Sequence, residues 1–231
     1  MWRSHMVIGA SSWLAVQALA DPVSGIALDW REQACGAVVA AGGALLCDLD
    51  TPNSRLAQSL GPVTRVAARV SGWVFGGHRV GTHSLAFCAL IGALSTLALT
   101  QGELVRLPGG PAVTVGQLVA LAIAYLASAL SVALLTGLRG LRAGVLTAGL
   151  VALGASTMAP PAGLVSAALT IGCASHLLAD LLTPEGTAPL WPFSARRVHL
   201  AVIRRTGDRR ETLVVLTVAL VTLGAIAGAY P

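Results

Sequence analysis

Seven hydrophobic runs dominate the chain, at residues 6–20, 33–47, 84–100, 113–137, 143–159, 163–182 and 212–230. An α-helix needs about 20 apolar residues to cross a bilayer, so the first two runs are either half-buried or extended by flanking residues. The connections contain helix breakers, such as Asp-Pro at 21–22 and Pro-Pro at 160–161. We therefore expect an all-α, polytopic membrane protein of about six to seven hydrophobic helices. It would form a single membrane-embedded domain over residues 1–231.

The first run leaves a choice between a secretory signal and a retained helix. Cleavage after Ala-Leu-Ala at 18–20 would suit a signal peptide. His5 directly before this run and the six runs that follow favour a retained first helix.

The segment 53–77 has an amphipathic pattern instead of a uniformly apolar one. Its apolar residues fall near one helical face and Arg65 and Arg69 lie on another, with Trp73 nearby. A basic amphipathic helix with a Trp is typical of the interface between a bilayer and anionic headgroups. The apolar positions are Leu60, Val63, Ala67, Val70 and Val74.

Composition supports the membrane class. The chain has 55% hydrophobic and 11% charged residues, with a mean hydropathy of +0.77, which excludes an ordinary soluble domain and a disordered chain. Aromatic residues make up only 4%, so helices would pack through small residues. The four cysteines form no Cys-x-x-Cys pair, which argues against a disulfide framework or a thiolate zinc site. We expect them to be small buried residues.

The distribution of arginine predicts the orientation. All fifteen basic residues are Arg, and thirteen of them fall on one side if the spans alternate from a cytoplasmic N-terminus. Only Arg31 and Arg106 fall outside, in agreement with the positive-inside rule. The inside segments would be 1–5, 48–83, 138–142 and 183–211. The sequence thus predicts a multi-pass protein of the inner (plasma) membrane with a cytoplasmic N-terminus.

Four polar islands at the ends of the hydrophobic runs contain most of the His and the candidate carboxylates. They are His5, CDLDTP (47–52), HRVGTHS (78–84) and SHLLADLLTP (175–184). Ionisable groups are costly inside a bilayer and are retained there mainly for function. The topology deduced from arginine places all four islands on the cytoplasmic side, which predicts one composite metal site there.

The spacing within the islands suits metal binding. His176 and Asp180 are four residues apart, so they share one face of a predicted helix. His78 and His83 are five apart, which predicts His78 in a loop and His83 at the start of a helix, where Thr82 or Ser84 would cap the helix or fix a His tautomer. Imidazole and carboxylate together favour zinc or another first-row divalent ion.

The candidate residues have the following expected roles. The metal ligands would be His5, Asp50, His78, His83, His176 and Asp180. Asp48 would act as a ligand or as the general base, or Asp48 and Asp50 would together bridge two ions. Arg79 would hold a phosphate or stabilise its developing charge.

Two of the islands resemble each other. ALLCDLDTP (44–52) and HLLADLLTP (176–184) align without gaps and share both Leu, Asp, Leu, Thr and Pro. Asp48 then corresponds to Asp180, whereas Asp50 has no acidic counterpart. The match fits either an old duplication or two helices that end alike at one site.

The ordered set of motifs resembles a family of bacterial inner-membrane-associated proteins regarded as metal-dependent hydrolases. The matching residues are His5; Asp48, Asp50, Pro52 and Ser54; His78, Arg79, Thr82, His83 and Ser84; Ser175, His176, Asp180, Thr183 and Pro184; and Leu190–Pro192. Relatives often carry His where this chain has Thr51. One member has been described as binding the SOS repressor LexA. The family is grouped with zinc-dependent phospholipases C and single-strand nucleases, which implies phosphoester hydrolysis.

These observations predict a membrane-bound metal-dependent hydrolase that acts on a phosphoester, lipid-like substrate at the cytoplasmic face. The arginines of 183–211 would either determine topology or bind substrate phosphate, and we expect membrane lipids as partners and no specific nucleic-acid binding. The alternative is a non-enzymatic protein: a divalent-metal transporter or a metal-stabilised docking platform for a cytoplasmic regulator. A transporter would place ionisable residues near mid-span, whereas here they lie at span ends.

Overall fold

The computed structural model describes residues 2–24, 28–54, 57–58, 62–100, 103–106, 112–114, 162–205 and 207–229. This part of the chain is mainly helical, as predicted. The helices are α1 (Trp2–Ser24), α2 (Trp30–Leu46), the 3-10 turn η1 (Cys47–Asp50), α3 (Pro62–Val74), α4 (Leu85–Leu99), α7 (Ala162–Leu181) and α8 (Arg209–Ala229). The predicted run 143–159 and residues 115–137 of the predicted run 113–137 lie outside the described residues, whereas Val113 and Thr114 belong to a strand.

Two local features depart from the sequence-based expectations. A short antiparallel hairpin, β1 (Glu103–Arg106) with β2 (Ala112–Thr114), follows α4, where a connection and the first residues of the predicted helix 113–137 were expected. The predicted break at 21–22 is wrong, because α1 continues to Ser24. A proline near the end of a helix removes one backbone hydrogen bond, and the turn before it can still be helical.

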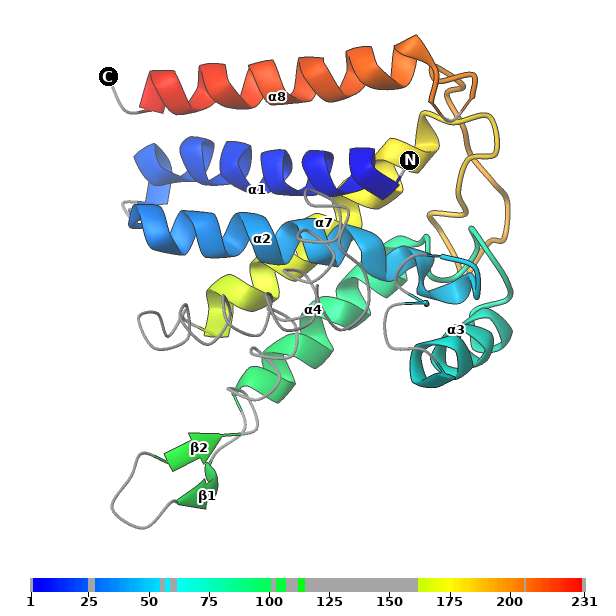
Figure 1. Ribbon diagram of the computed structural model, residues 1–231, viewed down its shortest axis with the longest axis horizontal. Helices are drawn as coiled ribbons and strands as arrows, with labels where there is room; N and C mark the ends of the chain where they lie inside the picture. The colour runs from blue at the N-terminus through cyan, green and yellow to red at the C-terminus, as the bar shows by residue number, and fades with distance from the viewer. Residues whose placement is uncertain are drawn as a thin grey trace.

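The helices form a bundle in which α8, α1 and α2 lie side by side, α7 crosses behind α1 and α2, and α4 packs against α7 (Figure 1). Trp13 of α1, Val39 and Ala40 of α2, and Val165 and Leu169 of α7 form the main core cluster. Small residues bring α2 and α7 into backbone contact: a Cβ at Gly172 would lie 2.2 Å from the carbonyl oxygen of Ala40. Such close approach is typical of membrane helix packing.

Among the described residues, three helical segments are long and apolar enough to cross a membrane. They are Trp30–Asp50, Gly163–Leu181 and Arg209–Gly228. The 15-residue α4 is apolar but shorter, and the 23-residue α1 falls outside this set. On α8, Leu213, Leu216, Leu220 and Leu223 are all exposed, which suits contact with lipid.

Helix α3 occupies the segment that was predicted to be an interfacial helix. Its Ala68 is buried, whereas Val66, Val70, Trp73 and Val74 are exposed. The helix packs against η1. The apolar stripe of α3 is therefore turned away from the bundle; its contact with a bilayer interface stays a prediction.

The polar islands come together because of how the helices end. The first residues of α1 and α4 and the last residues of α2 and α7 lie at the same end of the bundle, on the right in Figure 1. Helix α4 begins here because the Oγ of Ser84 accepts a hydrogen bond from the Phe87 amide, as one of the two predicted caps. At this end Ser4 of α1 also donates a hydrogen bond to Glu211 of α8.

Candidate metal site

Three buried side chains form the centre of the polar cluster. The Nε2 atoms of His83 and His176 are 3.1 Å apart, and the Oδ2 of Asp180 lies 3.4 Å from each of them. His83 directly precedes Ser84, the N-cap of α4. His176 and Asp180 lie one turn apart on α7, as the spacing predicted. All three residues are at most 1% exposed.

The tautomers of the two histidines follow from their partners. Nδ1 of His176 donates to the carbonyl oxygen of Ala44, 2.5 Å away, because a carbonyl can only accept. The Thr82 hydroxyl uses its proton in a 2.5 Å bond to Oδ2 of Asp50, so it must accept from Nδ1 of His83 at 3.0 Å. When both rings are neutral, each Nε2 atom therefore has a lone pair that points toward the other.

This geometry fits a divalent cation. Two opposed nitrogen lone pairs 3.1 Å apart and a carboxylate repel one another unless a positive charge lies between them. In a tetrahedral zinc site with bonds of about 2.0–2.1 Å, neighbouring ligand atoms lie roughly 3.3–3.4 Å apart. The three distances among His83, His176 and Asp180 are close to that value. Backbone or carboxylate acceptors on the outer ring nitrogens are also typical of metal-binding His.

The second carboxylate oxygen of Asp180, Oδ1, contacts a guanidinium and an imidazole on the side away from His83 and His176. Oδ1 lies 3.3 Å from Nη2 of Arg79 and 3.4 Å from Nε2 of His5. Arg79 is itself buried and donates from Nη1 to the Thr183 hydroxyl at 2.7 Å, while its Nε lies 3.2 Å from Oε2 of Glu185. These contacts turn Oδ2 of Asp180 toward the two histidines.

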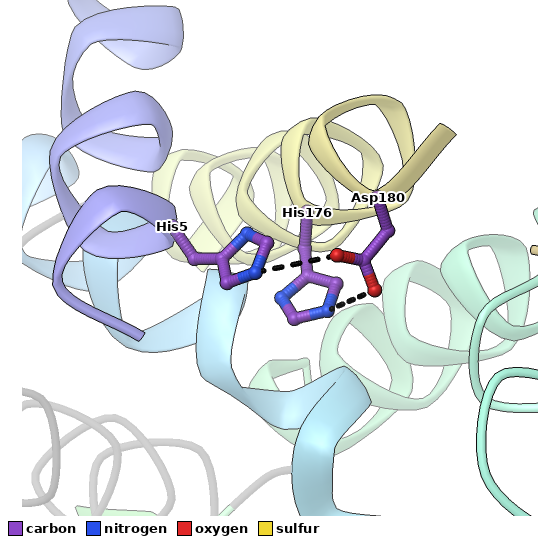
Figure 2. Close-up of side chains that lie close together, drawn as sticks. All are labelled: His5, His176 and Asp180. Atoms are coloured by element: carbon purple, nitrogen blue, oxygen red, sulfur yellow. Dashed lines mark ion pairs between the residues drawn. The ribbon is translucent and has the colours of Figure 1, made fainter. Parts of the chain in front are cut away.

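His5 comes from the first turns of α1 and closes the cluster on one side. Its ring stacks on His176 with centroids 3.9 Å apart, and its Nε2 faces Asp180, as Figure 2 shows. The Nδ1 of His5 is buried and has no hydrogen-bond partner in the described part of the chain. A buried polar atom without a partner is costly, so a water or ion at this place would be favourable.

The two aspartates of η1 have different surroundings. Asp48 lies at the rim, with its side chain 24% exposed and Oδ1 3.9 Å from the Nε2 atoms of both His83 and His176. Asp50 is buried and its carboxylate joins two histidines: Oδ2 lies 3.6 Å from Nδ1 of His83, and Oδ1 lies 2.9 Å from Nδ1 of His78. Asp50 therefore fixes the orientation of both rings.

His78 is the most exposed member of the cluster, at 43% of its side chain. Its Nδ1 contacts Asp50 and also the hydroxyl of Thr51 at 2.9 Å. The hydrogen bond with Asp50 raises the pKa of His78 above its ordinary value, because a carboxylate favours the protonated ring, while partial burial opposes this. The His78 ring therefore lies at the solvent-exposed side of the site, which we call its mouth. Its Nε2 makes none of the contacts described for this part of the chain.

The structure brings all eight predicted site residues into one region. Seven of them form three overlapping groups, and within each group the ligand atoms lie within 4.8 Å of one another. The groups are His5, His176 and Asp180; Asp48, His83 and His176; and Asp50, His78 and His83. Arg79 contacts the first of them. That these residues bind a metal stays a prediction. Two contacts of the site were not predicted: the Ala44 carbonyl, because a backbone acceptor has no sequence signal, and Glu185, which lies next to the fourth island.

The fold and the site together define a helical membrane protein with a buried His/Asp cluster at one end of its bundle. The chain matches the family model described as YdjM inner membrane protein over residues 1–230, and it belongs to this family. Comparisons with curated proteins and with solved structures gave no match. Family membership and the apolar helices place the protein in the inner membrane.

Proposed function

We propose that the protein is a multi-pass, membrane-bound, metal-dependent hydrolase that acts on a phosphoester at the cytoplasmic face, with zinc as the preferred ion. One observation carries the proposal. The lone pairs of His83 and His176 face each other across 3.1 Å, and both atoms face Oδ2 of Asp180. A divalent cation between these three atoms would offset their mutual repulsion, and His with carboxylate is the donor set of catalytic zinc sites.

The residues divide into ligands and residues that position them. His83, His176 and Asp180 would hold the ion, with Asp48 at the rim as a fourth ligand or as the general base. A bound divalent ion supplies a water molecule of lowered pKa and polarises the scissile group. Arg79 would act from behind, because its guanidinium already contacts Asp180, Thr183 and Glu185.

The place of the site favours a lipid-like substrate. His78 is exposed and Asp48 is partly exposed, so a substrate would approach from their side. Helix α3 packs against η1 beside them and exposes an apolar stripe next to Arg69. An amphipathic helix of this kind at a headgroup interface would bring the site close to the phosphates of membrane lipids.

The experiment uses the full chain purified in detergent. Elemental analysis should find at least about one divalent ion per chain, and the protein should hydrolyse a generic phosphodiester only when metal is present. His83→Ala and His176→Ala should lose both. His199→Ala is the matched control, because His199 is exposed and lies outside the three groups. The absence of bound metal, or unchanged turnover in His83→Ala and His176→Ala, would overturn the proposal.

The second candidate is a non-enzymatic protein with a structural ion. Complete burial of His83 and His176 favours it, since a structural site needs the same ligands and no access. Such an ion would stabilise a docking platform for a cytoplasmic regulator. Metal that is retained in purified protein without any turnover, and whose removal lowers the unfolding temperature, would support this candidate.

A further inference from the structure

Arg197 lies at the mouth of the cluster and is exposed to solvent. Its Nη2 donates a hydrogen bond to the carbonyl oxygen of His78, with a length of 3.1 Å. The ring of His78 contacts Asp50 on its inner side, and the rings of His78 and His83 are 5.1 Å apart. A short series of contacts thus connects Arg197 to the centre of the site.

The backbone beside Arg197 is fixed. Val198 pairs with Thr187 in an antiparallel bridge, with amide-to-carbonyl distances of 2.8 Å and 3.1 Å. Thr187 is fully buried and follows Gly186, whose carbonyl accepts a hydrogen bond from Arg79. The segment that carries Arg197 is therefore attached to the end of α7, close to Asp180.

The charge of Arg197 is available, unlike that of Arg79. Arg79 is buried and paired with Asp180 and Glu185. In the part of the chain that the structure describes, Arg197 contacts only a neutral carbonyl and no carboxylate. The other N–H groups of its guanidinium are therefore free to bind an anion, and their planar arrangement matches the oxygens of a phosphate.

We propose that Arg197 forms an anion subsite at the mouth of the His/Asp cluster and binds the phosphate group of the substrate, next to the exposed ring of His78. The proposal deepens the proposed hydrolase function and rests on it. The ligand chemistry is a phosphate oxygen pair, present in inorganic phosphate and in a phosphomonoester lipid headgroup. Arg197 is a substrate-binding residue in this proposal, and the bond-breaking step is left to the cluster behind it.

The test compares Arg197→Gln with Arg196→Gln. Arg196 is the neighbouring exposed arginine, and only its backbone amide makes a described contact, with Ser194. Both variants remove one positive charge from the same surface. Binding of inorganic phosphate to the metal-loaded full chain in zwitterionic detergent is measured by calorimetry. Arg197→Gln should weaken it by about 10- to 100-fold, because a charge-assisted hydrogen bond is lost. Arg196→Gln should match the unmodified protein, and Arg197→Lys should recover part of the loss.

Kinetics and lipid competition complete the test. For a soluble phosphodiester, Arg197→Gln should raise KM more than it lowers kcat. If a lipid headgroup is the source of the phosphate, phosphatidic acid in mixed micelles should compete with inorganic phosphate in Arg196→Gln and much less in Arg197→Gln; if free phosphate is the source, phosphatidic acid should compete in neither.

The outcomes separate the two proposals. Metal-dependent turnover with equal phosphate affinity and KM in Arg197→Gln and Arg196→Gln would overturn the subsite and leave the hydrolase intact. Phosphate binding that depends on Arg197 without any turnover would support the subsite and overturn the hydrolase.

Discussion

The ends of α2 and α7 have nearly the same sequence, and the structure places them at one site. In both, the amide of a Thr bonds to the carbonyl of the Asp three residues earlier: Thr51 to Asp48 at 3.2 Å, and Thr183 to Asp180 at 3.0 Å. The shared local pattern therefore ends both helices alike and delivers two carboxylates to the same pair of histidines. This geometry agrees with both explanations of the match, an old duplication and two helices that end alike at one site.

The two ends differ in their tertiary contacts. Asp180 is almost completely buried and its Oδ1 faces Arg79 and His5. Asp48 has no such partners among the described contacts, and its side chain remains partly exposed 3.9 Å from the histidines. The same helix ending therefore supplies a fixed carboxylate in α7 and a more accessible one in α2. The neighbours decide which role each of them takes.

Replacing the buried carboxylate should have the largest effect. Asp180→Asn removes a charged ligand, so we expect loss of metal. The guanidinium of Arg79 also loses its buried partner, so we expect the free energy of unfolding to fall by about 3 kcal/mol. Metal content and thermal unfolding in detergent measure the two effects. Asp29→Asn, at the exposed N-cap of α2, is the control and should keep its metal. Full metal content in Asp180→Asn would contradict the assignment of this residue as a ligand.

Replacing the rim carboxylate tests the other half of the comparison. If Asp48 is the general base, Asp48→Asn should retain its metal and lower kcat by roughly 10²- to 10⁴-fold, the usual contribution of a positioned base. Metal content and kcat are measured on the same preparation. Loss of metal equal to that in Asp180→Asn would show instead that the two helix ends play the same part.

Arg79 should have a smaller effect, on the affinity for metal. Arg79→Gln removes the group that turns Asp180 toward the histidines, and loss of such outer partners weakens metal binding by about 10- to 100-fold. A competition titration with a chelator measures the Kd. Arg79→Lys should restore part of the affinity. A merely structural role would lower the unfolding temperature of the metal-free protein and leave the metal Kd unchanged.

The sequence predicted the participants of the site better than their roles. The distribution of Arg and the position of the islands at span ends were sufficient to gather His5, Asp48, His83 and Asp180 at one end of the bundle, because a helix delivers its last residues to a definite place. The orientation of a side chain depends on partners far away in sequence. Arg79 has a φ of 62°, so the chain turns sharply there, and its guanidinium reaches inward to Asp180 while His78 faces outward.

Composition likewise predicted the helical membrane class but not every element. The hairpin β1–β2 lies between the runs 84–100 and 113–137 and takes in the first two residues of the second run, which was predicted to be a helix. The contacts of Asp50 could not be predicted for another reason. Asp50 shows no feature in sequence that distinguishes it from a ligand, and it is recognised as an orienting residue only when both His78 and His83 are seen on its carboxylate.

The smallest expected effect concerns Asp50, the acid that has no counterpart at the end of α7. Because the bond to Asp50 raises the pKa of His78 in the folded state, the protonated ring stabilises the fold. This contribution is fully present below the unfolded pKa of about 6.5 and is lost as the pH rises through the higher folded value. In metal-free protein, His78→Gln should therefore lower the unfolding temperature more at about pH 5.5 than at about pH 8.5. Asp50→Asn should remove that pH dependence, and His199→Gln should show none. A difference between His78→Gln and the unmodified protein that stays constant with pH would mean that the Asp50–His78 contact orients the ring without stabilising its charge.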